Sequence, residues 1–160
     1  MKNQFYIGLL LLLSFSLMSS TCSSDDDAMS DNSQQIAQIE VQATSGTWRI
    51  TNFVDSGVDE TADFNGYDFT FNTDGNLIAT NGANTLNGTW SVTDDSNGSS
   101  DDSNDDDDID FNIFFPVPDS NDFEDLNDDW DVVSNSATQI ILIDISGGNG
   151  GTDNLTFERN

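Results

Sequence analysis

From residue 47 onward, apolar and polar side chains alternate over short segments of the chain. In the clearest segment, Tyr67, Phe69 and Phe71 are separated by single polar residues. A period of two is typical of β-strands that bury one face. The alternation predicts strands at 47–54, 67–71, 77–80, 86–92, 109–115, 130–133, 139–145 and 155–159. Phe53 is out of phase in the first of these, which predicts a β-bulge there.

A short helix is predicted before the strands. Ile36, Ile39 and Ala43 recur at helical spacing, and Ser33 can cap the start of a helix over 33–43. About eight strands, joined in sequence order by turns and accompanied by little helix, predict an all-β fold. We expect an antiparallel up-and-down meander that closes into a barrel, because closure leaves no exposed strand edges.

Turn residues separate the predicted strands. Residues 73–76 (Thr-Asp-Gly-Asn) favour a hairpin turn, and Pro116 and Pro118 end the fifth strand. In the acidic stretch that follows, Phe123 and Leu126 are at helical spacing. We expect this short helical turn to plug one end of the barrel, in preference to forming a movable lid.

The first residues have the pattern of a secretory signal peptide. Lys2 supplies a positive start, 5–18 is almost entirely apolar, and small residues occupy 19–21. The apolar stretch is shorter than the roughly 20 residues that a membrane-spanning helix needs. We therefore predict that residues 1–21 are a signal peptide.

Cys22 is the only cysteine of the chain and directly follows the small residues. An unpaired thiol in an oxidising compartment needs an explanation, and lipidation supplies one because it consumes the thiol. The sequence Ser-Ser-Thr-Cys is a loose match to a lipobox and lacks its usual Leu. We predict cleavage before Cys22 and a lipid anchor on it, with the membrane as partner. The alternative is ordinary cleavage nearby that leaves a free thiol.

Two segments are rich in Asp, Ser and Asn and cannot form a core. Residues 22–33 are predicted to be the lipidated cysteine and a disordered acidic tether. Residues 94–108 are predicted to be a long disordered loop between the fourth and fifth strands. The β domain would then run from 34 to 160 and include that loop.

Charge and composition exclude several functions. The chain has 160 residues, a net charge of −27 and no histidine. Nucleic acid is excluded as a partner because phosphate binding needs Lys and Arg, and anionic lipid surfaces are disfavoured for the same reason. Zinc sites with Cys or His ligands and nucleophile–imidazole pairs are also excluded. Paired carboxylates can hydrolyse glycosides, but no pair stands out, so we predict no enzyme activity and no cofactor.

The acidic run 101–108 is a candidate for weak calcium association, since calcium prefers several oxygen ligands. It lacks the EF-hand spacing of alternating acids, a central Gly and a distal Glu. A solvated loop is the favoured interpretation, and no defined metal site is predicted.

The residues after Cys22, Ser-Ser-Asp-Asp-Asp, resemble the start of surface lipoproteins of the Bacteroidota type. In those proteins a short acidic run after the lipidated cysteine acts as an export signal. The resemblance implies a lipid-anchored protein of the outer membrane, displayed at the cell surface. The same acidic residues would also make a solvated tether.

A second resemblance involves Gly46, Thr47 and Trp48, which follow the predicted helix and resemble the lipocalin Gly-x-Trp signature. Arg159, near the end of the last strand, is similar to the basic residue that packs over that Trp in lipocalins, which implies a cation–π contact. Residues 34–160 thus resemble small lipocalin-like lipoproteins of Bacteroidota. The alternative explanation for Trp48 and Trp90 is ordinary core packing.

Two functions remain open from the sequence. The resemblance to lipocalins implies a small apolar ligand inside the barrel, lined by Tyr67, Phe69, Trp90 and Phe111. The alternative is a structural, protein-interaction or cation-binding lipoprotein with a filled barrel. Bulky aromatic residues on each inward face favour a filled interior, whereas Gly88 leaves room for a limited cavity.

Overall fold

The computed structural model describes residues 31–94, 109–145 and 151–160. The predicted signal peptide, Cys22, most of the predicted tether and nearly all of the predicted acidic loop lie outside these residues. Among the described residues, no helix is long and apolar enough to cross a membrane.

The described residues form one antiparallel sheet of nine strands with a single α-helix. The helix is α1 (Asp31–Ala43). The strands are β1 (Trp48–Asp55), β2 (Val58–Asp59), β3 (Asp68–Phe71), β4 (Asn76–Thr80), β5 (Thr85–Asp94), β6 (Ile109–Phe114), β7 (Asp128–Asn135), β8 (Gln139–Asp144) and β9 (Asp153–Arg159). Two short 3-10 helices are η1 (Thr61–Phe64) and η2 (Glu124–Leu126).

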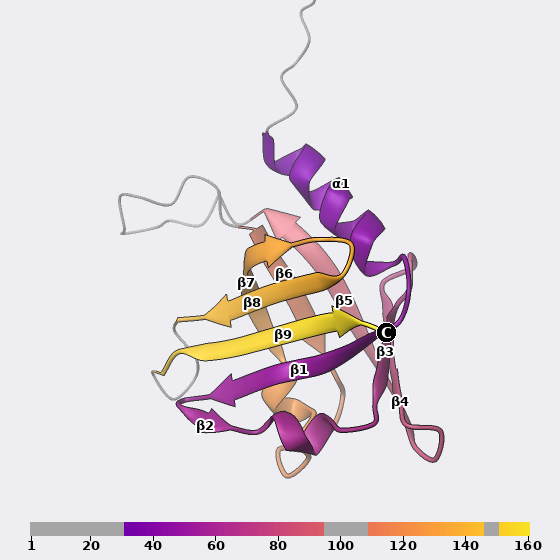
Figure 1. The fold of residues 1–160 in the computed structure, drawn as a ribbon, viewed down its shortest axis with the longest axis vertical. Coiled ribbons are helices and arrows are strands. Elements are labelled where there is room, and N and C mark those ends of the chain that lie inside the picture. Colours follow the sequence, from indigo (N-terminus) through magenta and orange to yellow (C-terminus); the bar gives the residue numbers. More distant parts are fainter. Residues whose placement is uncertain (1–30, 95–108, 146–150) are drawn as a thin grey trace, which may run out of the picture.

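The sheet closes into a barrel because β1 pairs with both β9 and β3 (Figure 1). The β1–β9 ladder runs from Trp48 opposite Arg159 to Val54 opposite Asn154. The β1–β3 contact consists of one pair, Trp48 opposite Phe69. The predicted all-β meander and barrel are therefore confirmed. The predicted bulge is also present, as a shift in the β1–β9 register between Ile50 and Asn52.

The predicted strands agree with the observed ones to within a few residues, with one omission. Strand β2 and helix η1 lie in a segment where no strand was predicted. Both residues of β2 are exposed, so the segment lacks the buried alternation that marks a strand. The turn from β1 to β2 uses positive φ angles at Ser56 and Gly57, 46° and 84°.

Two predicted boundaries shift for one reason. Helix α1 begins at Asp31, inside the predicted tether, and β5 extends to Asp94, the first residue of the predicted loop. Asn32 is buried and its side-chain amide donates to the carboxylate of Asp94 at 3.1 Å. This contact joins two polar residues that are distant in sequence, and no local pattern predicts it.

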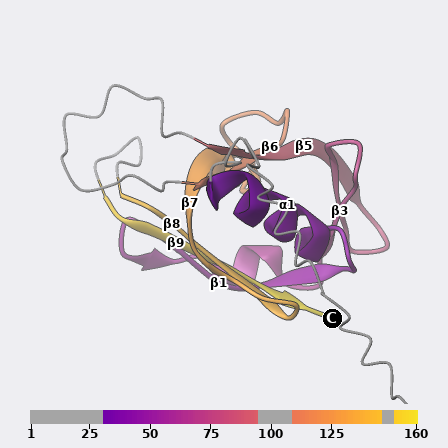
Figure 2. The same ribbon diagram turned by 90° about the horizontal axis from the view of Figure 1, so that it is seen from above.

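The barrel interior is filled with large side chains, and its two ends are covered. The fully buried aromatic residues are Trp48, Phe53, Phe64, Phe69, Phe71, Phe111, Phe115, Trp130 and Phe157. Helix α1 lies across one opening, where Ile39 and Ala43 are buried (Figure 2). At the other end, the short helices η1 and η2 bury Phe64 and Leu126.

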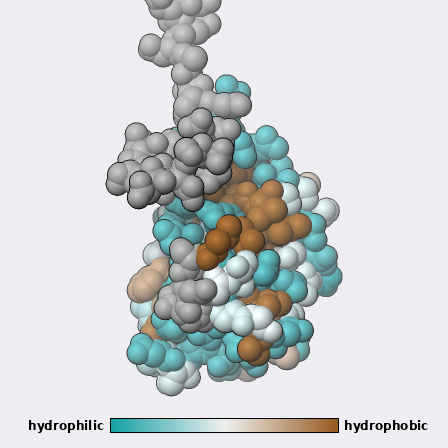
Figure 3. Space-filling view, turned by 90° about the vertical axis from the view of Figure 1, so that its left-hand side faces the viewer, coloured by the Kyte–Doolittle hydropathy of each residue, from teal (hydrophilic) through white to brown (hydrophobic). Residues whose placement is uncertain are grey.

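The outer surface is mostly polar, with local apolar areas such as the one in Figure 3. The exposed large apolar side chains of the described residues are Val41, Val58, Phe114, Val133 and Ile145. Single exposed apolar residues are common and need no special explanation. Phe114 is of interest because it lines the larger of the two surface hollows described below.

Candidate functional site

The four residues predicted to line a ligand cavity are brought together inside the barrel. Their side chains contact other aromatic rings and do not face an open cavity. Phe69 and Phe111 are fully buried, Trp90 is 7% exposed and Tyr67 is half-buried. The Trp90 ring stacks on Phe111 with centroids 5.5 Å apart, and Phe71 lies 5.3 Å from both. These edge and stacked geometries are those of a packed aromatic core.

The remaining ring contacts extend this packing to the far end of the barrel. Phe123 lies 4.9 Å from Tyr67, 6.0 Å from Phe69 and 5.3 Å from Phe64. Phe123 is only 4% exposed. Phe123 and Leu126 therefore plug this end, as the sequence predicted.

Gly88 does not leave a cavity, contrary to the expectation from its size. A β-carbon at Gly88 would clash with the carbonyl oxygen of Phe114 and lie 2.8 Å from the ring of Phe115. The backbone of the neighbouring strand and an aromatic ring already occupy the space beside this glycine. Its role is therefore to permit close approach of β5 and β6.

The three residues of the lipocalin-like signature also meet at the end covered by α1. A β-carbon on Gly46 would lie 2.7 Å from Nε of Arg159, and Arg159 is the strand partner of Trp48. The Trp48 indole donates to the carbonyl of Ala43 at 2.8 Å, which ties the barrel to the helix. The Arg159 guanidinium donates to the carbonyls of Ser45 and Ala137. The cation–π contact between Arg159 and Trp48 that the lipocalin resemblance implies stays a prediction.

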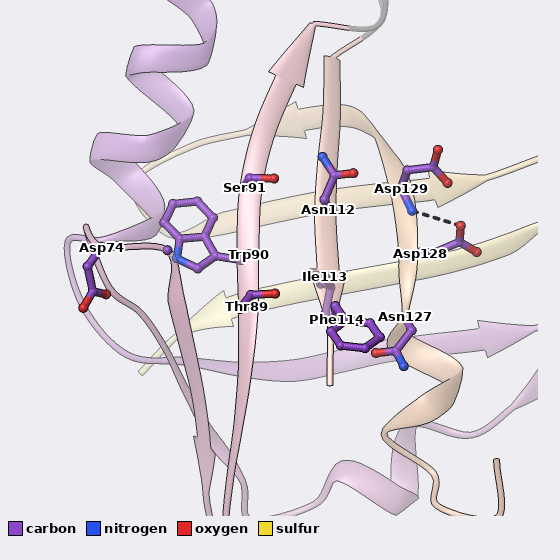
Figure 4. A pocket seen from close by; sticks show the side chains of 11 residues that line it. Asp74, Thr89, Trp90, Ser91, Asn112, Ile113, Phe114, Asn127, Asp128 and Asp129 are labelled. Carbon is purple, nitrogen blue, oxygen red and sulfur yellow. Dashed lines mark hydrogen bonds between the residues drawn. The ribbon is translucent and has the colours of Figure 1, made fainter. Parts of the chain in front are cut away.

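A surface groove of about 710 Å³ lies on the outer face of the barrel, over β5, β6 and the start of β7 (Figure 4). Its lining residues are Asp74, Gly75, Thr89, Trp90, Ser91, Asn112, Ile113, Phe114, Asn127, Asp128 and Asp129. A second hollow of about 320 Å³ shares Gly75, Trp90 and Ser91 with it and reaches Glu40 and Val41 of α1. The two hollows are therefore neighbours on one side of the molecule.

The strand register places the outward side chains of the groove in rows. Ser91 on β5 is opposite Asn112 on β6, and Asn112 is opposite Asp129 on β7. In the neighbouring row, Thr89 is opposite Phe114. Phe114 is 53% exposed, so its ring forms an apolar surface among hydrogen-bonding groups.

Asp128 is the lining residue with the most altered acidity. The pKa of Asp128 is raised to about 7, chiefly by burial and also by its hydrogen bond with the Asp129 side chain and by the nearby charge of Asp144. A hydrogen bond from the Asp129 amide at 2.9 Å acts in the opposite direction without cancelling these effects. The carboxyl group of Asp128 is therefore partly protonated near neutral pH.

This acidity predicts a pH-dependent stability. Because the folded-state pKa of Asp128 lies above the ordinary value of 3.8, protonation favours the folded state, and the stabilisation is lost as pH rises from 3.8 to about 7. We expect Asp128→Asn to have a higher urea midpoint than the wild type at pH 8 and a similar one near pH 4. Asp119→Asn, which removes an exposed charge, is the matched control. Equal gains for both variants at pH 8 would show that only the overall negative charge matters.

Carboxylates also gather at the plugged end of the barrel. Partial burial raises the pKa of Asp125, and the charges of Glu124 and Asp55 raise it further. Among residues 31–94, 109–145 and 151–160, no group of three or more Asp, Glu, His or Cys side chains is arranged to hold a metal ion. The run 101–108, for which weak calcium association was considered, lies outside these residues.

Comparisons with known proteins give one match. No protein-family model and no curated protein matches the chain. Among solved structures, the chain is similar to a DUF4847 family protein from Bacteroides vulgatus, with 19% sequence identity and a TM-score of 0.47. The similarity covers 74% of this chain and 94% of that chain. What the protein does therefore has to be inferred from its own residues.

The groove was not predicted from the sequence, although one signal for it exists. In the strand 109–114, inward apolar residues alternate with Asp110 and Asn112, and Phe114 occupies the next outward position. An aromatic residue at a position where alternation calls for a polar one marks an exposed apolar surface. The contributions of Asp128 and Asp129 depend on the pairing of β6 with β7, which local pattern does not reveal.

Proposed function

We propose that the protein is a lipid-anchored, surface-displayed lipoprotein whose filled β-barrel binds partners through its outer face and has no enzymatic activity. The observation that carries the filled-barrel part of this proposal is the packing of Trp90, Phe111 and Phe71 against one another inside the barrel. Aromatic side chains that contact one another in this way leave little room for a ligand between them. The alternative of a small apolar ligand held by Tyr67, Phe69, Trp90 and Phe111 would require these rings to separate.

The anchor is supported by the sequence at Cys22 and by the placement of the barrel after a polar segment. Stable anchoring takes two or more acyl chains, as an N-terminal lipidated cysteine provides. The acidic residues after Cys22 support display at the outer face of an outer membrane. With its excess of negative charge, the domain would stay soluble and away from the anionic lipid surface.

Native mass spectrometry tests both parts of the proposal on one sample. The full chain is expressed in a bacterial host that lipidates cysteines and is extracted with mild detergent. We expect a mature mass that begins at Cys22, carries the lipid and includes no further small molecule. Cys22→Ala should leave the membrane fraction or accumulate as the uncleaved precursor.

Two results would contradict the proposal separately. A mature chain with a free Cys22 thiol would refute the anchor. A retained apolar small molecule, lost when the barrel is unfolded, would refute the filled interior. Cys22→Ser serves as a second variant, because it replaces the sulfur and keeps the side-chain size.

A further inference from the structure

The groove over β5, β6 and β7 combines one apolar ring with a row of hydrogen-bonding groups. Neighbouring strands lie about 4.8 Å apart, so the row Ser91, Asn112 and Asp129 spans about 10 Å. The second row, Thr89 and Phe114, lies two residues along the strands, a distance of about 7 Å. These spacings match one or two sugar rings laid flat on the sheet.

We propose that this groove binds a neutral saccharide, with one sugar ring stacked on Phe114 and its hydroxyl groups hydrogen-bonded to Ser91, Asn112 and Asp129. A sugar ring has an apolar face of C–H groups and a rim of hydroxyls that both donate and accept. Phe114 offers the complementary apolar face, 53% exposed. The hydroxyl, amide and carboxylate groups of the row offer both donors and acceptors. This inference rests on the proposed outer-face function and specifies its ligand.

The site is held in place before any ligand binds. The Asn112 side chain donates to Oγ1 of Thr93 at 2.9 Å, which fixes the amide and leaves its Oδ1 to accept a ligand hydroxyl. The Asn127 side chain clamps the backbone of Phe115, accepting from its N–H at 2.5 Å and donating to its carbonyl at 3.0 Å. This clamp holds the end of β6 and so positions Phe114. Fixed groups lower the entropy cost of binding.

Other ligand classes fit the lining less well. The groove has no Lys, Arg or His among its lining residues, so phosphorylated or sulfated ligands would meet only negative charge. A cation would be drawn to the carboxylates, but that of Asp74 already accepts the backbone and side-chain N–H groups of Asn76, at 3.1 and 2.7 Å. The row at the centre of the groove contains two neutral side chains and one carboxylate. A neutral ligand with many hydroxyls uses all of these groups.

Isothermal titration calorimetry of the full chain in detergent tests the proposal. Three neutral oligosaccharides serve as probes: maltopentaose, cellopentaose and xylopentaose. We expect saturable binding of at least one of them, unchanged in about 0.5 M NaCl because the ligand is uncharged. Phe114→Ala and Asn112→Ala should each weaken binding about tenfold or more, whereas Phe114→Tyr should retain it because the ring is preserved.

Val133→Ala is the matched control, since Val133 in β7 is exposed to a similar extent, 58%, but does not line the groove. Its binding should equal that of the wild type. The proposal is overturned if no probe binds at about 10 mM, or if Phe114→Ala binds as well as the wild type. Salt-sensitive binding of spermine, with no saccharide bound, would overturn it in favour of a cation site. These titrations do not probe the barrel interior. Failure of the saccharide proposal would therefore be distinguishable from failure of the filled-barrel proposal, which is tested by native mass spectrometry.

Discussion

Phe71→Ala is expected to lower the free energy of unfolding by about 3–5 kcal/mol, the usual cost of truncating a fully buried aromatic side chain. Phe71 is 1% exposed and its ring contacts those of Trp90, Phe111 and Phe157 at 5.3–5.4 Å. Its removal would leave a cavity at the centre of the interior, because the surrounding rings cannot all close over it. Urea denaturation followed by tryptophan fluorescence measures the change.

Phe114→Ala makes the same chemical change on the outer face and is the control. Phe114 is 53% exposed, so its truncation should cost well under half as much. If Phe71→Ala and Phe114→Ala had similar small effects, Phe71 would be lining an open cavity and would not be part of a packed core.

The second large effect is expected for Gly88→Ala, which should destabilise the barrel by about 2–3 kcal/mol. The added methyl group would meet the backbone carbonyl of Phe114 and the ring of Phe115. A backbone atom in a paired strand cannot move aside without breaking the β5–β6 ladder, in which Thr89 pairs with Phe114. The midpoint of thermal unfolding measures this cost.

Gly46→Ala is the control for Gly88→Ala, because its added methyl group would also make a close contact, but with a group that can move. A β-carbon there would lie 2.7 Å from Nε of Arg159, but this is the far end of a flexible side chain. We expect a cost below about 1 kcal/mol, because the guanidinium can shift. If Gly46→Ala and Gly88→Ala destabilised the protein equally, the backbone of β6 would also be able to shift at little cost. That result would contradict a tightly packed β5–β6 contact.

Much of the fold could be predicted because each barrel strand buries one face. Segments such as 67–71 and 109–115 carry strict alternation, and that pattern depends only on local sequence. Strand β2 was missed since it buries nothing, and the Asn32–Asp94 contact was missed since it joins polar residues distant in sequence. Local pattern predicts which residues face inward; tertiary pairing decides which of them meet.

The candidate site was less predictable than the fold. Phe69, Trp90 and Phe111 are buried as the alternation predicts, and Tyr67 is half-buried against them, but the sequence could not decide between a lined cavity and mutual contact. That choice depends on the barrel's width and on residues such as Phe123 that enter from outside the strands. The outer groove depends on the registers of β5, β6 and β7, which bring Ser91, Asn112 and Asp129 into one row.

The filled interior is tested most directly by titrating the wild-type protein with 1-aminoanthracene, an apolar dye whose fluorescence rises in a dry cavity. For the wild type, we predict no saturable rise at micromolar dye, because the rings that would surround the dye contact one another. The cavity left in folded Phe71→Ala is the size of one ring, so this variant should instead be stabilised against heat by benzene, as engineered apolar cavities admit small aromatic molecules, and the wild type should not. Saturable binding to the wild type, displaced by a fatty acid, would contradict the filled interior.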